Sequence, residues 1–134
     1  MRVHDGRAIP NFINQALNNN DLTVYGQGTQ TRSFCYVNDT IEGIVKLLFS
    51  NYQYPVNIGN PDEYSILDLV EIIKKETKSN SKIIYKELPK NDPKVRKPDI
   101  TLAKKKLAWS PKIKLIDGIK LTINYFRNLS NFKK

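Results

Sequence analysis

The chain has 134 residues, of which 40% are hydrophobic, and 22 Lys and Arg against 13 Asp and Glu give it a formal net charge of +9. This length supports one domain with a usable core. The sequence contains neither a signal-peptide pattern nor an apolar run long enough to cross a bilayer, so we expect a cytoplasmic protein with no membrane partner.

A helix and two short strands are predicted first along the chain. Apolar residues at helical spacing predict the helix over Pro10 to Leu17, and two apolar runs predict strands at Leu22 to Tyr25 and Arg32 to Val37. Gly26-Gln27-Gly28 lies between the strands and predicts a hairpin turn. A dinucleotide-binding fingerprint is excluded, because it needs a third glycine and a helix directly after the turn. The only cysteine, Cys35, lies in the second strand, where we expect a buried, inert thiol.

Two amphipathic helices with a strand between them are predicted in the middle of the chain. The first begins at Asp39, whose carboxylate is placed to accept a backbone N–H in a capping-box-like start. Its apolar stripe consists of Ile41, Ile44, Val45 and Leu48. Pro55 to Gly59 is typical of a buried strand. The second helix begins at Ser65, and its apolar stripe consists of Ile66, Leu69, Val70 and Ile73.

The remaining elements are a strand, a loop and two helices. The strand is predicted at Lys82 to Tyr85, and Leu88 to Pro98, with three prolines and alternating charge, is a loop. Helices follow at Ile100 to Leu107 and Ile116 to Phe126. Because strands and helices alternate, the predicted class is α/β, or α+β, with a small sheet and flanking helices rather than a full doubly wound sheet.

The positive charge permits two interpretations. Most lysines lie on predicted helices, which favours ordinary solvated helix faces. A basic nucleic-acid-binding module is the alternative of another class, because a basic surface attracts phosphates. The lysines are not interleaved with aromatic residues as single-strand binding requires, so nucleic acid is the weaker interpretation. We expect no metal site.

Two arginines are candidates for holding a diphosphate. Arg32 lies at the start of a predicted strand, and Arg96 lies in a loop with Pro93 and Pro98 on either side. A guanidinium is suited to this role because its planar fork bonds two oxygens at once, and flanking prolines lower the entropy lost when a loop orders around an anion. The local pattern by itself favours two ordinary surface arginines, and only the resemblance described next favours the binding role.

Several blocks of the sequence, taken together and in order, resemble a known family. They resemble the nucleotide-sugar-binding, C-terminal portion of the extended short-chain dehydrogenase/reductases, the NAD-dependent epimerase/dehydratase superfamily. The resemblance is greatest to UDP-glucuronate decarboxylase, also called UDP-xylose synthase. Related alternatives are dTDP-glucose 4,6-dehydratase and UDP-sugar 4-epimerase, over which the Asp-Pro-x-x-Arg-x-Pro-Asp-Ile block favours the decarboxylase. The matching blocks are Asp5 to Leu17, Leu22 to Asp39, Pro55 to Leu69, Asp92 to Ile113 and Leu115 to Arg127.

The resemblance implies that the ligand is a UDP-sugar and that residues 1–134 form one nucleotide-sugar-binding domain. Substrate-binding roles fall on Asn11, Gln15, Thr23, Tyr25, Gln30, Arg32 and Arg96. The helix that carries Asn11, Phe12 and Gln15 would border the nucleotide. Thr23 and Tyr25 would lie near uracil and ribose, and Gln30 and Arg32 near ribose and the phosphates. Arg96 would reach the UDP-sugar and is a possible auxiliary to protonation.

Cofactor and catalysis form the second part of what the resemblance implies. Arg7, and with less support Arg2, match positions near a bound NAD. Complete family enzymes oxidise the sugar at C4, lose carbon dioxide from the resulting β-keto acid and return the hydride, and they are commonly homodimers. They also carry a Rossmann cofactor-binding half and a Tyr-x-x-x-Lys pair, and this sequence contains neither motif.

The chain is therefore predicted to be a substrate-binding portion whose cofactor-binding half is missing. We expect it to bind no NAD and to be inactive alone, with that half as its partner. A truncated gene product, a split gene and an expressed piece of a longer enzyme all fit. In the resembled fold the helix at Asp39 to Phe49 and the strand at Val56 to Ile58 pack against the cofactor half, so an apolar face should lie open.

Overall fold

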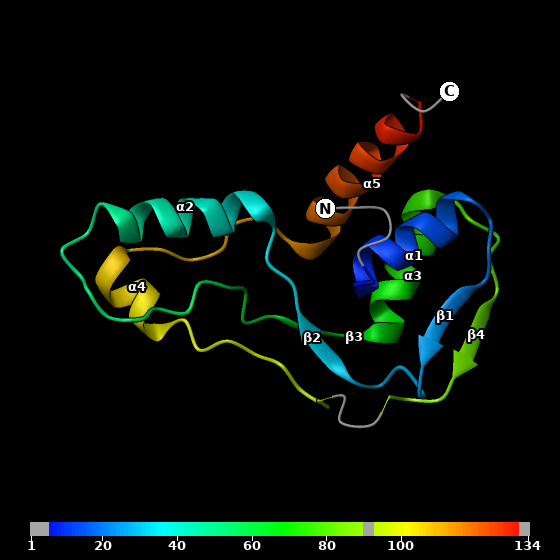
Figure 1. Cartoon of the computed structure of the whole chain (residues 1–134), viewed down its shortest axis with the longest axis horizontal. Coiled ribbons are helices and arrows are strands. Elements are labelled where there is room, and N and C mark those ends of the chain that lie inside the picture. The colour runs from blue at the N-terminus through cyan, green and yellow to red at the C-terminus, as the bar shows by residue number, and fades with distance from the viewer. Residues whose placement is uncertain (1–5, 90–92, 132–134) are drawn as a thin grey trace.

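The computed structural model describes residues 6–89 and 93–131. In chain order its elements are α1 (Ala8–Leu17), β1 (Leu22–Tyr25), β2 (Thr31–Ser33), α2 (Val37–Leu48), β3 (Glu63–Ser65), α3 (Ile66–Thr77), β4 (Ile83–Lys86), α4 (Thr101–Leu107) and α5 (Leu115–Asn131). The molecule is elongated, with α2 and α4 at one end and α1, α3, β1 and β4 at the other (Figure 1). The predicted α/β class with small sheets is confirmed.

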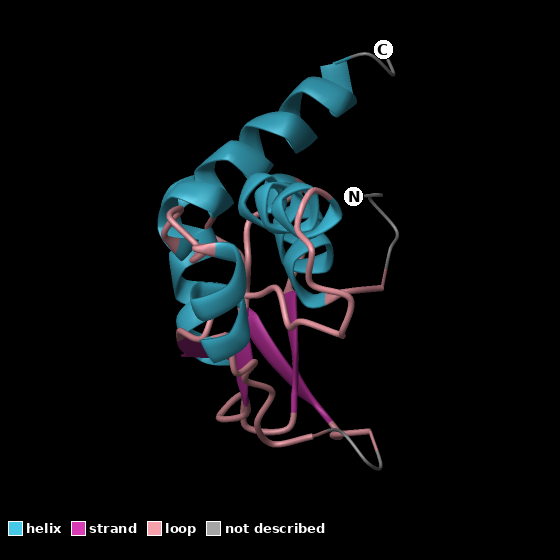
Figure 2. Cartoon of the chain, turned by 90° about the vertical axis from the view of Figure 1, so that its left-hand side faces the viewer, coloured by secondary structure: helices cyan, strands magenta, loops and turns pink. Residues whose placement is uncertain are grey.

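The strands form two separate two-stranded sheets. β1 pairs in parallel with β4, from Leu22 opposite Ile83 to Tyr25 opposite Lys86. β2 pairs antiparallel with β3, with Arg32 opposite Tyr64. Seen from the side in Figure 2, the strands lie below the helices and lead into loops at the lower end of the molecule.

The predicted hairpin between β1 and β2 is wrong, although a turn is present. Gly26 and Gly28 adopt positive φ angles of 63° and 70°. After this turn the chain does not run back along β1. It passes the start of α3 instead, where the N–H groups of Ile66 and Leu67 donate to the carbonyls of Gln30 and Gly28. The start of α3 therefore takes the place of a hairpin partner, and Leu67 packs so closely that a Cβ on Gly28 would lie 2.8 Å from its Cγ.

The main core lies between α1, α3, α5 and β1. The helix predicted from Ser65 is confirmed, and a capping box begins it: the Ser65 Oγ accepts from the Asp68 N–H at 3.0 Å, and the Asp68 carboxylate accepts from the Ser65 N–H at 3.1 Å. The apolar stripe of α3 is fully buried. The buried residues of this core are Phe12, Ile13, Ala16, Leu22, Val24, Ile66, Leu69, Val70, Ile73, Leu115, Ile119, Ile123 and Phe126.

α2 begins two residues earlier than predicted, at Val37, and Asp39 does not cap it. The Asp39 side chain is buried, and its Oδ2 accepts hydrogen bonds from the backbone N–H groups of Lys112, at 3.1 Å, and Ile113, at 2.9 Å. The Trp109 indole N–H donates to the Asp39 carbonyl at 2.9 Å. Asp39 therefore connects α2 to the segment between α4 and α5, which a local capping argument could not foresee.

Replacing Asp39 with alanine should destabilise the fold by about 2–4 kcal/mol, because two part-buried backbone N–H groups lose their acceptor. Urea denaturation followed by the fluorescence of Trp109 measures the change. Asp39→Asn retains one acceptor oxygen and should cost less. Asp21→Ala, in the exposed turn before β1, is the control and should change stability by less than about 0.5 kcal/mol. Equal midpoints for the Asp39 and Asp21 variants would contradict the role of Asp39.

The strand predicted at Pro55 to Gly59 is also wrong. Within the described residues this segment pairs with no other strand. Val56 and Ile58 instead pack on a second, smaller core of Ile100, Ala103, Leu107 and Trp109. α2 approaches this segment at Gly43, where an added Cβ would lie 2.6 Å from the Ile58 Cγ2, so only glycine fits there.

The outward side of α2 carries an open apolar surface, as predicted. We call it the α2 face, and it consists of Val37, Ile41, Ile44, Val45, Leu48 and Phe49. Leu48 is 73% exposed and Phe49 83%. Contiguous apolar side chains on one exposed helix face are more typical of an interaction surface than of the exterior of a monomer. Among the described helices, none is long and apolar enough to cross a membrane.

Candidate functional site

The predicted substrate residues lie on α1, on β1 and the turn after it, on β2, and in loop 93–98. Gln15 and Thr23 are held together: the Gln15 Nε2 donates to the Thr23 Oγ1 at 3.1 Å, and the Gln15 Oε1 accepts from the Thr23 N–H at 3.1 Å. Asn11 lies one helical turn before Gln15 and is half-buried. Phe12 points into the main core, so its contribution to this helix is packing.

Tyr25 and Gln30 lie at the two ends of the glycine turn. The Gln30 Nε2 donates to the Tyr25 carbonyl at 3.0 Å and so closes the turn. The Tyr25 side chain is 43% exposed at the end of β1. An exposed aromatic ring beside a closed turn offers an apolar face on which a planar base could stack.

Arg32 lies in β2 and is half-buried. Its Nη1 donates to the Thr31 carbonyl at 2.7 Å, which fixes one end of the guanidinium against its own strand. β2 is short, and it pairs along one edge with β3. The position of Arg32 is therefore determined by a sheet and by a side-chain hydrogen bond, and not by a flexible loop.

Loop 93–98, which carries Arg96, is tied to the same sheet. The Thr31 N–H donates to the Lys94 carbonyl at 2.9 Å. The Glu63 carboxylate, on β3, accepts from the Thr31 Oγ1 at 2.7 Å and pairs with the Lys97 Nζ at 3.3 Å. The hydrogen bond from Thr31, and in second place the lysine, lower the pKa of Glu63. Arg96 is exposed between these two attachment points, on a segment that adjoins the strand of Arg32.

Glu63, Thr31 and Lys97 were not singled out from the sequence. Thr31 and Lys97 lie beside the two predicted arginines, so their neighbourhood was visible. Glu63 had no such signal, because the prediction contained no strand at β3 and thus nothing to place this carboxylate next to β2. The only sequence indication was an acidic residue two positions before a helix cap.

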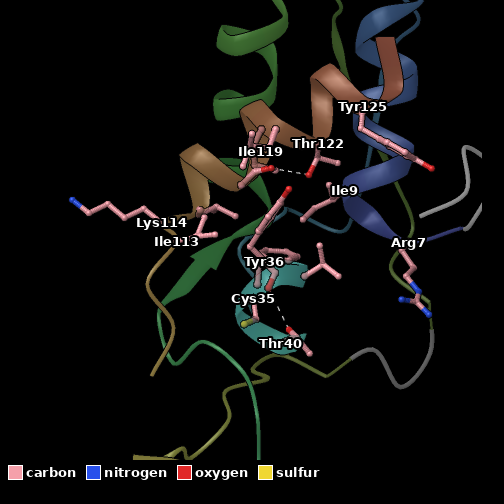
Figure 3. A pocket seen from close by; sticks show the side chains of 15 residues that line it. Arg7, Ile9, Cys35, Tyr36, Thr40, Ile113, Lys114, Ile119, Thr122 and Tyr125 are labelled. Atoms are coloured by element: carbon pink, nitrogen blue, oxygen red, sulfur yellow. Dashed lines mark hydrogen bonds between the residues drawn. The ribbon is translucent and has the colours of Figure 1, made fainter. Parts of the chain in front are cut away.

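Arg7 lies apart from these residues, and Arg2 falls outside the described residues. Arg7 precedes α1 and lines a hollow of about 570 Å³ between α1, α5 and the start of α2 (Figure 3). Tyr36 points into this hollow toward α5, whereas Lys114 extends away from it on the side opposite Arg7. Val37 belongs both to the hollow and to the α2 face, so the two surfaces are continuous.

Cys35 also lines this hollow and is half-buried, not fully buried as predicted. Burial raises the pKa of the thiol, with a smaller raising effect from the nearby Asp39 carboxylate and an opposing hydrogen bond to Thr40. A raised pKa keeps the thiol protonated at neutral pH, and a protonated thiol is a poor nucleophile.

The Gly26–Gly28 turn does not fit the diphosphate of NAD. Such a site needs glycines at a strand-to-helix turn, where the helix N-terminus receives the phosphates. The Gly26–Gly28 turn leads into strand β2, and the space beside Gly28 is filled by Leu67 and Val24. Within residues 6–89 and 93–131, no group of three or more His, Cys, Asp or Glu is placed to hold a metal ion.

Comparison with known proteins identifies the fold and the family of this chain. The fold is shared with UDP-glucuronic acid 4-epimerase from Bacillus cereus, solved in complex with UDP-glucuronic acid and NAD, at a TM-score of 0.88 and 31% identity over 96% of this chain. The GDP-mannose 4,6 dehydratase family model matches residues 3–122, and the chain belongs to this family of extended short-chain dehydrogenase/reductases.

Among curated proteins, the chain is similar to UDP-glucuronic acid decarboxylases. It is 46% identical to UDP-glucuronic acid decarboxylase 6 of Arabidopsis thaliana over 95% of its length, and 47% identical to UDP-glucuronic acid decarboxylase 1 of Xenopus tropicalis. The chain spans only 37% and 30% of those two relatives, and 41% of the Bacillus cereus epimerase. The resemblance to a portion of these enzymes, predicted from the sequence, is confirmed.

Proposed function

We propose that this chain is the UDP-sugar-binding portion of a UDP-glucuronate decarboxylase. The observation that carries the proposal is the attachment of loop 93–98 to β2, which brings the segments of Arg32 and Arg96 side by side. Two guanidinium groups on adjoining segments suit a diphosphate, because each offers a fork of donors to its oxygens. The side chains that would receive uracil and ribose lie on the segment from α1 to the start of β2. They are Gln15, Thr23, Tyr25 and Gln30.

A UDP-sugar 4-epimerase is the second candidate, because the solved structure with UDP-glucuronic acid named above is an epimerase. The higher identity to the decarboxylases, 46–47% against 31%, favours decarboxylation. Arg96 is the residue that could assist a proton transfer to the sugar, since it is exposed in the loop and carries a permanent positive charge.

The chain should need a partner portion to complete the reaction. We propose that it binds no NAD by itself and that a cofactor-binding portion docks on the α2 face and the adjoining hollow. The exposed apolar side chains of this face support this role. Segment 55–58, which pairs with no strand among the described residues, lies beneath α2 and would offer its backbone to a further strand.

The test of the proposed ligand is a comparison of UDP with uridine. The chain should bind UDP about tenfold or more tightly than uridine, because the arginines contact only the phosphates. Isothermal titration calorimetry at about 0.1 M salt measures both affinities. A single-stranded oligonucleotide serves as the control for the alternative of another class. Tighter binding of the oligonucleotide than of UDP, with a steep salt dependence, would contradict the proposal.

A further inference from the structure

Glu63 occupies the junction of three segments that are distant in the sequence. It lies on β3, accepts from the Thr31 hydroxyl on β2 at 2.7 Å, and pairs with Lys97 of loop 93–98 at 3.3 Å. The backbone bond from Thr31 to Lys94 attaches the other end of the same loop. Arg96 thus stands one residue from the Lys97 attachment and two from the Lys94 attachment.

This arrangement differs from a scattered surface ion pair. An isolated Lys–Glu pair on a surface contributes little, because both side chains lose entropy and water screens the attraction. Here the carboxylate has two partners from two segments, and one of them, Thr31, also donates its N–H to the loop. The consequence is a constraint on the backbone that carries Arg96, and a constrained loop loses less entropy when it closes on an anion.

We propose that Glu63 is a positioning residue, which holds loop 93–98 against β2 so that Arg96 faces the diphosphate together with Arg32. The inference rests on the proposed function for the identity of the ligand. Glu63 itself does not contact UDP, because its carboxylate would repel the phosphates. Its effect on affinity passes through the loop to Arg96.

Replacing Glu63 with glutamine should weaken UDP binding about two- to fivefold and leave uridine binding unchanged. Glutamine keeps the shape and an acceptor for Thr31 but loses the charge that holds Lys97. Glu71→Gln, which removes an exposed carboxylate from α3, is the matched control and should leave UDP binding unchanged. Exchanging the two charges in the double variant Glu63→Lys, Lys97→Glu should restore part of the lost affinity.

A double-mutant cycle separates positioning from general damage. In the Arg96→Ala background, Glu63→Gln should have no further effect on UDP, because the residue through which it acts is gone. Additive losses in the cycle would overturn the inference, since Glu63 would then act independently of Arg96. So would an equal loss of uridine binding, which would indicate a damaged fold.

Amide hydrogen exchange tests the attachment of the loop without any ligand. In Glu63→Gln the Thr31 N–H, which bonds to Lys94, should exchange about two- to fivefold faster. The Leu22 N–H, bonded to the Lys82 carbonyl, is the internal control and should not change. An unchanged rate at Thr31 would overturn the inference even if the chain binds UDP. A faster rate at Thr31 in a chain that fails to bind UDP would support the attachment and count against the proposed function alone.

Discussion

Replacing Arg32 or Arg96 with alanine should weaken UDP binding about tenfold to a hundredfold and leave uridine binding nearly unchanged. A hydrogen bond to a charged group contributes about 1.5–3 kcal/mol, and every 1.4 kcal/mol is a factor of ten in affinity. The lost contacts are to phosphate and not to base or ribose, so the effect should separate the two ligands. Calorimetry on both variants with both ligands measures it.

The arginine variants need a control for charge and one for folding. Arg127→Ala removes an exposed positive charge from α5 and should change UDP affinity by less than twofold, because α5 runs away from β2 and β3 (Figure 1) and salt screens its charge. Arg32 also bonds the Thr31 carbonyl, so its variant should be checked by urea denaturation. Equal losses for UDP and uridine would mean that the fold was damaged. No loss for either ligand would make both arginines ordinary surface residues.

This chain, supplied with UDP-glucuronate and NAD, should form no UDP-xylose above a blank. The reaction needs a nicotinamide held beside the sugar and a base to start the oxidation. The sequence contains no Tyr-x-x-x-Lys pair, and the glycine turn of the described residues leads into a strand instead of a helix. Product analysis by mass spectrometry decides the outcome. Formation of UDP-xylose by the purified chain would contradict the proposals that it binds no NAD and that it needs a partner portion.

Adding a cofactor-binding portion taken from a related decarboxylase should restore turnover if it docks on the α2 face. Leu48→Lys places a charge at the C-terminal end of this face, where Leu48 is 73% exposed, and should abolish the restoration without unfolding the chain. Tyr85→Lys, on β4 at the other end of the molecule, replaces an exposed aromatic side chain with the same charge and should leave the restoration intact. Equal restoration in both variants would place the docking surface elsewhere.

The elements that could be predicted from the sequence are those whose causes are local. α3 begins directly after its N-cap Ser65, because the side chains of Ser65 and Asp68 each accept from the backbone N–H of the other, and both residues are visible within four positions of the chain. β1 was predicted with its observed bounds, because Leu22 and Val24 alternate with polar neighbours. The substrate residues came from matching blocks of sequence, which indicate a family without requiring contacts to be known.

The elements that were predicted wrongly have causes that lie far away in the chain. Asp39 has the chemistry of a helix cap, but its acceptor oxygen is taken by N–H groups more than 70 residues later. Gly26 and Gly28 permit a hairpin, but α3 and β4 occupy the positions that would have completed it. Residues 55–58 have the composition of a strand, yet a strand needs a partner for its backbone, and none is present among the described residues.

The candidate site likewise has one part that could be predicted from the sequence and another that only the structure shows. Arg32 and Arg96 could be named from residue type and resemblance, because a guanidinium is the usual partner of a diphosphate. That their segments adjoin follows only from the hydrogen bond between Thr31 and Lys94, and that Glu63 holds the loop follows only from the pairing of β2 with β3. The sequence by itself determined which side chains are candidates for the chemistry. The tertiary structure decided which of them meet, because long-range backbone pairing does not depend on spacing along the chain.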